Sequence, residues 1–106
     1  MSIRGKLRDG ATVYLQPGEQ VQVAFLAKRR TAPYNDRAVV ATDRRLLLLR
    51  LNFFGRPTAL LGTSERHVRL GPCRGFMYRL PVFDSGLAVN KRFFSDVAEA
   101  DRAAGF

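Results

Sequence analysis

The sequence predicts a mainly β fold that ends in one C-terminal α-helix, and three observations lead to this prediction. Most of the chain consists of short apolar segments separated by turn signals. The segments recur about every 8 to 12 residues, which is typical of small antiparallel sandwiches and barrels. The last stretch changes to a helical spacing of apolar residues. The length of 106 residues provides for one hydrophobic core and not for two.

Residues 1–14 predict a basic arm or short helix ahead of the main domain, which spans 15–106. Ile3 and Leu7 recur at helical spacing. Between and around them lie the basic residues Arg4, Lys6 and Arg8. The two glycines of this arm weaken the helix, because Gly costs a helix interior about 1 kcal/mol relative to Ala. A turn follows at 16–19, where Pro presets φ and Gly accepts a positive φ.

The first strand is predicted at 21–27, where apolar side chains alternate with others. One face of this strand carries Val21, Val23, Phe25 and Ala27. Period two with one apolar face is typical of a half-buried strand. The strand ends in a basic run, and residues 31–36 form a loop by composition, since they contain Pro33 and the pair Asn35-Asp36.

Two strands at 38–41 and 46–51, joined by a tight turn at Thr42-Asp43, are predicted next. The alternative is a single helix over 37–52, since Leu and Arg are good helix formers and short apolar runs are ambiguous by periodicity alone. The β-branched residues in the first half of this stretch favour the two strands.

The remaining strand-like segments lie at 58–61, 67–70, 75–83 and 87–89. The chain then predicts an amphipathic C-terminal helix that Ser95 caps and Gly105 ends. Its apolar stripe is Phe93, Val97, Ala100 and Ala104. Such a stripe has to cover something, and we expect it to close an open barrel end or to cover a sheet edge.

The charge is strongly basic, with 18 Lys and Arg against 9 Asp and Glu, and a formal net charge of +9. The excess lies before residue 93, while the C-terminal stretch is mildly acidic. A domain with this field attracts anionic partners such as phosphate backbones, acidic lipid headgroups or acidic proteins.

The residues that carry chemistry are few, and we expect no enzyme, no cofactor and no small-molecule substrate. One histidine, His67, and one cysteine, Cys73, cannot supply a structural zinc site. Cys73 could be a reactive thiol, because Arg69 and Arg74 would stabilise its thiolate. No apolar run approaches the length of a membrane span or of a signal peptide, so we expect a soluble, cytoplasmic protein that could be membrane-peripheral.

The candidate binding site is the basic loop between the first two strands. An anion or lipid site would consist of Lys28, Arg29, Arg30 and Arg37. Arg44 and Arg45 fall at the opposite end of the same hairpin and do not belong to this patch. The alternative interpretation is a set of solvated charges that end strands and protect edges.

Two motifs resemble those of the bacterial pleckstrin-homology-like (PH-like) domains. One is Leu15-Gln-Pro-Gly-Glu19, and the other is the Thr-Asp-Arg-Arg hairpin with its apolar strand, residues 39–48. The end of the chain, residues 89–101, is also similar to the end of these domains. The resemblance implies a bent antiparallel barrel of about seven strands capped by one helix. It carries Lys28 and Arg37 onto two basic positions of the lipid-binding members, but Val39 stands where a further Arg is expected.

Three functions are consistent with these features. The first is a non-catalytic interaction module that binds a protein partner or forms homo-oligomers, through a groove beside the C-terminal helix. The second is peripheral binding to anionic membrane lipids through the basic loop, aided by the N-terminal arm. The third is nucleic-acid binding, which would use aromatic stacking groups. The candidate groups are Phe53, Phe54, Phe76 and Tyr78. Their alternation favours a place in the core over stacking.

Overall fold

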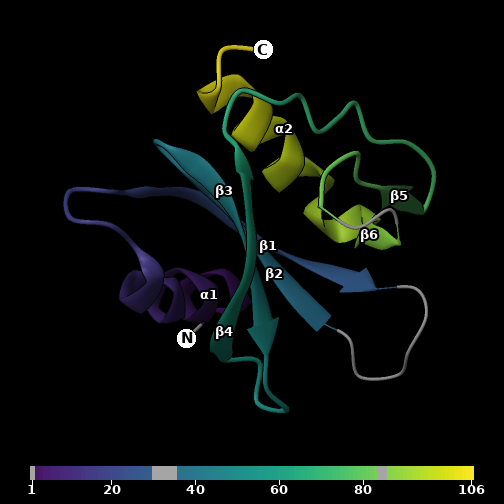
Figure 1. Ribbon diagram of the computed structural model, residues 1–106. Coiled ribbons are helices and arrows are strands. Elements are labelled where there is room, and N and C mark those ends of the chain that lie inside the picture. Colours follow the sequence, from purple (N-terminus) through teal and green to yellow (C-terminus); the bar gives the residue numbers. More distant parts are fainter. Residues whose placement is uncertain (1, 30–35, 84–85) are drawn as a thin grey trace.

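The protein is a six-stranded antiparallel sheet with one helix on each face (Figure 1). The computed structural model describes residues 2–29, 36–83 and 86–106. The strands are β1 (Val21–Arg29), β2 (Asp36–Thr42), β3 (Arg45–Leu51), β4 (Pro57–Glu65), β5 (Met77–Arg79) and β6 (Leu87–Asn90). They lie in the order β4-β3-β2-β1-β6-β5. The helices are α1 (Ile3–Ala11) and α2 (Phe94–Ala103), with 3-10 turns at Thr12–Tyr14 and Lys91–Phe93.

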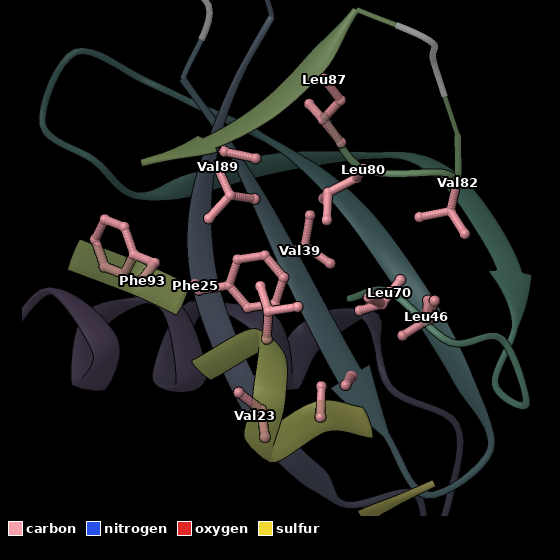
Figure 2. Packing of buried hydrophobic residues seen from close by; sticks show 14 of the residues in the cluster. Val23, Phe25, Val39, Leu46, Leu70, Leu80, Val82, Leu87, Val89 and Phe93 are labelled. Atoms are coloured by element: carbon pink, nitrogen blue, oxygen red, sulfur yellow. The ribbon is translucent and has the colours of Figure 1, made fainter. Parts of the chain in front are cut away.

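The three central strands are buried on both faces, which explains their nearly continuous apolar sequences. Alternate side chains of a strand point to opposite faces. On β1, Phe25 therefore packs in the cluster under α2, while Ala24 packs in the cluster under α1. Figure 2 shows Phe25 at the centre of the α2 cluster, between Val39 and Phe93. The prediction of a half-buried strand underestimated the burial of β1, because α1 covers its second face.

The two-strand interpretation of residues 37–52 is confirmed. β2 and β3 form a hairpin whose register pairs Val40 with Leu47 and Arg37 with Arg50. Its turn lies at Asp43 and Arg44. The single helix is excluded, since residues 45–51 form a strand, and residues 46–50 of it have partners on both sides.

The described strands do not close into a barrel, and there are six of them where the sequence led us to expect about seven. β4 and β5 are the two edges of the sheet. The predicted strand at 67–70 is absent, because the Asp101 carboxylate on α2 accepts from the backbone N–H groups of Leu70 and Gly71 at 2.7 and 2.9 Å. Of 75–83, only β5 is a strand.

Both helices form where the sequence indicates. At the start of α1, the Ser2 hydroxyl accepts from the Gly5 N–H at 3.0 Å. Gly10 allows close packing on β4, since a Cβ at this position would lie 2.5 Å from Pro57 Cδ. The predicted cap of the C-terminal helix was wrong: α2 begins at Phe94, and the turn before it is capped by Asn90, which accepts from the Arg92 N–H.

The C-terminal end of α2 follows the prediction. Gly105 has a φ of +94°, in the left-handed region that favours glycine after a helix. Of the predicted stripe, Phe93, Val97 and Ala100 are buried. Among the described residues, no helix is long and apolar enough to cross a bilayer.

Candidate functional site

Lys28, Arg29 and Arg37, three of the four basic residues predicted as a site, lie at one end of the sheet, as the strand register requires. Lys28 is paired with Asp36, and Ala27 with Arg37. Arg44 and Arg45 lie at the opposite end of the hairpin, which confirms their separation from the predicted patch. Arg30, the remaining member of the predicted site, lies outside the described residues.

Strand alternation divides these cations between the two faces of the sheet. Arg37 follows the parity of Val39, which packs in the cluster under α2, so Arg37 points to that face. Lys28 follows Ala27, a member of the same cluster, and therefore points to the other face. The sequence placed Lys28 and Arg37 in one site, but the structure puts them on opposite faces of one sheet end.

Arg37 is the most unusual cation of this end. Its residue is only 8% exposed, and its Nη1 donates to the Asp36 carbonyl at 3.3 Å. Burial lowers the pKa of its guanidinium, and the neighbouring charges of Arg50 and Arg29 lower it further, while Asp36 opposes this effect. In the described part of the chain, no carboxylate forms an ion pair with Arg37. A bound anion would offset the repulsion that Arg50 and Arg29 exert on the Arg37 guanidinium.

On the other face, Lys28 and Arg79 stand on either side of a small residue. Ala88 on β6 pairs with Lys28 on β1 and with Arg79 on β5, so the three side chains share one face. Two strand spacings separate the cations, about 10 Å between their backbones. They line a groove of about 480 Å³. Its other lining residues are Arg29, Met77 and Gly86.

The hairpin between β3 and β4 projects at the same end, at the bottom of Figure 1. Its tip carries Phe53, which is 88% exposed, and Phe54, which is 73% exposed. The expectation that these two aromatics belong to the core was wrong, and so it was for Phe76, which is also 73% exposed. Tyr78 packs against the core as expected. The core needs no further aromatic at the tip, because Leu49 and Leu51 already fill it from β3.

The tip has a well-defined shape in spite of its exposure. The Asn52 side-chain oxygen accepts from the N–H groups of Phe54 at 2.9 Å and Arg56 at 3.0 Å. Backbone bonds between Asn52 and Arg56 and between Gly55 and Asn52 close the same turn. Gly55 has a φ of +78°, which favours glycine. The two phenyl rings meet edge to face, with centroids 5.6 Å apart.

The opposite end of the sheet carries a buried ion pair that serves the fold. Glu19 accepts from Arg45 Nε at 2.9 Å and from its Nη2 at 3.0 Å, and from the Thr42 hydroxyl at 2.6 Å. The Arg45 bonds, with those from Thr42 and the Gln16 N–H, lower the pKa of Glu19 to about 2 against the effect of burial. Arg45 Nε and Nη2 thus donate to Glu19, and Nη2 also donates to the Tyr14 carbonyl. Arg45 is therefore a structural residue.

Arg66 ties the same end to α2. Its Nε donates to the Thr42 carbonyl at 2.6 Å, and its Nη2 donates to Gln22 Oε1 and to the Ala100 carbonyl. Burial lowers the pKa of its guanidinium, an effect that the charge of Asp101 opposes. These bonds hold the segment after β4 against the sheet and the helix.

The groups considered for chemistry are not arranged as a reactive site. His67 is exposed and its ring stacks on Phe106, with centroids 4.6 Å apart. Burial raises the pKa of the Cys73 thiol, and Asp101 raises it further, so the hypothesis of a stabilised thiolate is wrong. In residues 2–29, 36–83 and 86–106, no three His, Cys, Asp or Glu side chains come together as metal ligands.

The structure adds residues that the sequence did not assign to the basic end. Arg50 is the only cation of β3 after its first residue. This single charge within an apolar run was the one feature of the sequence that could have marked Arg50 as a functional residue. Arg79 alternates with the inward-facing Tyr78 and Leu80, but nothing in the sequence placed β5 two strands from Lys28. The sequence placed Arg56 in a turn but did not show that this turn lies at the basic end.

Of the three cations in the N-terminal arm, Lys6 lines a pocket with Arg56, whereas Arg4 and Arg8 are bound within the fold. Arg4 forms a bidentate ion pair with Asp96 at 2.8 and 2.9 Å, and Arg8 donates to backbone carbonyls of β1.

In comparisons with family models, curated proteins and solved structures, no match to the chain was found. Its assignment to a family therefore stays a prediction from its motifs.

Proposed function

We propose that this protein is a non-catalytic binding module that attaches peripherally to anionic membrane surfaces through the basic end of its sheet. The observation that carries the proposal is Arg37, a buried guanidinium flanked by Arg29 and Arg50. Burial and the like charges of Arg50 and Arg29 disfavour the charged form of Arg37. Lipid phosphates at a membrane surface would supply a negative charge beside it.

The distribution of charge supports the same conclusion. Cations of five strands or strand ends gather at this end of the sheet: Lys28, Arg29, Arg37, Arg50, Arg56 and Arg79. The acids near them in the described chain are Asp36, opposite Lys28, and Asp9, which lines a pocket with Arg56. Each basic residue near an anionic bilayer contributes about 1 kcal/mol of attraction, which salt weakens.

Sedimentation with vesicles tests the proposal. The wild-type protein should sediment with vesicles of phosphatidylcholine and phosphatidylserine at low salt and remain in solution with phosphatidylcholine alone. Arg50→Gln and Arg79→Gln, one on each face, should each weaken binding about fivefold. Arg44→Gln is the matched control, because it removes the same charge from the exposed turn at the opposite end. Equal losses in all three variants would reduce the effect to net charge and contradict a defined site.

A PH-like domain is the family we propose for this chain. The Pro-Gly-Glu turn and the Thr-Asp-Arg-Arg hairpin, which carry the resemblance, are in direct contact through Glu19, Thr42 and Arg45. The order of antiparallel strands followed by a helix also supports the assignment. An alignment of homologues tests it, since Glu and Arg should then vary together at positions 19 and 45.

A second candidate function is self-association, which the sequence favoured. The supporting observation is that edge strand β4 exposes Leu60 and Leu61 to solvent. Two register irregularities along β4 oppose it, because bulges hinder the addition of another strand to an edge. Light scattering after size exclusion decides the matter: a dimer that Leu60→Lys converts to a monomer would favour this function.

A further inference from the structure

The hairpin tip presents two adjacent phenyl rings to solvent with no protein group covering them. Phe53 and Phe54 are 88% and 73% exposed. Contiguous exposed aromatics of this kind mark interaction surfaces more often than chance exposure does. Neither ring lies in one of the two core clusters. The tip therefore has an apolar surface that folding leaves unused.

The backbone holds these rings outward. Asn52 accepts from two N–H groups within the loop, and Gly55 supplies the positive φ that closes it. The backbone polar groups of the turn are thus partly satisfied inside the loop, which lowers the cost of moving it out of bulk water. An ordered tip also loses less conformational freedom when it binds.

Cations flank the tip on both sides along the chain. Arg50 lies two residues before Asn52, and Arg56 follows Gly55 directly. Both are exposed, and Arg50 on β3 is also paired with Arg37 on the neighbouring strand β2. An apolar tip with a basic collar matches the layered chemistry of an anionic bilayer, with phosphates above acyl chains. An acidic protein partner would contact the cations directly and would not require two exposed phenyl rings that project beyond them.

We propose that the tip at 52–56 inserts Phe53 and Phe54 into the interfacial layer of an anionic bilayer while Arg50 and Arg56 contact lipid phosphates. This inference rests on the proposed membrane function and deepens it, since it assigns part of the binding to the hydrophobic effect. Insertion adds a component of affinity that salt does not screen. Binding should therefore persist in part at high salt.

Tryptophan placement tests insertion directly, because the chain contains no Trp. Phe54→Trp puts a single fluorophore at the tip. Phe76→Trp is the matched control: Phe76 is equally exposed at 73%, but it precedes β5 at the end of the β5-β6 pair away from Leu87 and Arg29. With vesicles of phosphatidylcholine and phosphatidylserine that carry brominated acyl chains, emission of the Phe54→Trp protein should shift to the blue and be quenched. Emission of the Phe76→Trp protein should do neither.

A double variant gives a second readout. Phe53→Ser with Phe54→Ser should retain binding at low salt but lose about tenfold or more at high salt. Binding without quenching of the tip tryptophan would overturn insertion and leave the electrostatic function intact. Absence of binding at low salt would overturn both. A dimer in solution that the double serine variant dissociates would assign the phenyl pair to a second copy and overturn the inference.

Discussion

Glu19 and Arg45 lie 26 residues apart and form a two-point ion pair, with Glu19 Oε2 2.9 Å from Arg45 Nε and Oε1 3.0 Å from Nη2. The Glu19 side chain is fully buried, whereas that of Arg45 keeps 20% of its surface exposed. The pair joins the turn before β1 to the hairpin between β2 and β3, and Arg45 also donates to the Tyr14 carbonyl at the end of the N-terminal arm. One guanidinium thus links three segments.

Replacement of one partner should be costly. Glu19→Gln leaves Arg45 partly buried without its counter-charge, and we expect the free energy of unfolding to fall by about 3 kcal/mol. Urea denaturation measures this. Glu65→Gln is the control, because Glu65 is exposed and such surface changes stay within about 0.5 kcal/mol. A loss no larger than the control's would show that the pair contributes little.

Acid should unfold the protein partly through the same carboxylate. The pKa of Glu19 is about 2 in the folded protein and near its usual 4.5 when unfolded. Because the folded value is lower, this stabilisation is complete above about pH 4.5 and is lost as pH falls towards 2. The linkage is worth about 3 kcal/mol. Urea denaturation at a series of pH values should show this loss in the wild type and a flatter profile in Glu19→Gln.

Asp101 should matter for the segment that replaces the predicted strand. Its two carboxylate oxygens accept separately from Leu70 N–H and Gly71 N–H, and Asp101 is buried. Asp101→Asn keeps one acceptor and turns an amide group towards the other N–H, which should cost about 1 to 3 kcal/mol. Hydrogen exchange at Leu70 should accelerate with it. Asp96→Asn, which breaks a partly exposed pair with Arg4, should cost less, about 1 kcal/mol.

Replacement of Arg37 should weaken membrane binding without lowering the free energy of unfolding. Arg37→Met keeps an apolar stem and removes a buried charge that faces Arg29 and Arg50. We expect unfolding in anion-free buffer to be unchanged or to require about 1 kcal/mol more. The same variant should bind phosphatidylserine vesicles more weakly than wild type in sedimentation. A clear destabilisation would mean that Arg37 has a structural role instead.

Gly10 should resist replacement in spite of its place in a helix. Ala is about 1 kcal/mol better than Gly in a helix interior. A Cβ at Gly10 would nevertheless lie 2.5 and 2.8 Å from Pro57 Cδ and Cγ, so Gly10→Ala should destabilise by about 1 to 3 kcal/mol. Pro57→Ala removes both carbons, and thermal denaturation of the double variant should show that the two changes are not additive.

Much of the fold could be predicted from local patterns. The alternation of β1, the β-branched residues of β2 and the turn at Asp43 were sufficient to place the central hairpin. Residues 67–70 could not be placed, since their apolar content fits a strand while the N–H of Leu70 bonds to a carboxylate 31 residues away. Local sequence does not record such long-range competition for N–H groups.

The candidate site was predicted in part. The sequence placed Lys28 and Arg37 at one end of a hairpin, which is confirmed, but it could not show that they face opposite sides. Phe53 and Phe54 were assigned to the core because the aromatic residues of the chain alternate as core residues do. Their exposure depends on how much volume the leucines of β3 already fill.

The sequence by itself determined β1, the hairpin of β2 and β3, the C-terminal helix and the excess of positive charge, because hydrophobic periodicity, turn chemistry and composition act over a few residues. The tertiary structure decided which strand neighbours which, and hence that Arg79 lies across Ala88 from Lys28 and that Arg29 and Arg50 crowd Arg37. It also left the aromatic tip uncovered. These features arise from packing between segments distant in the chain, where the pairing of whole surfaces, and not the propensity of any one residue, sets the free energy.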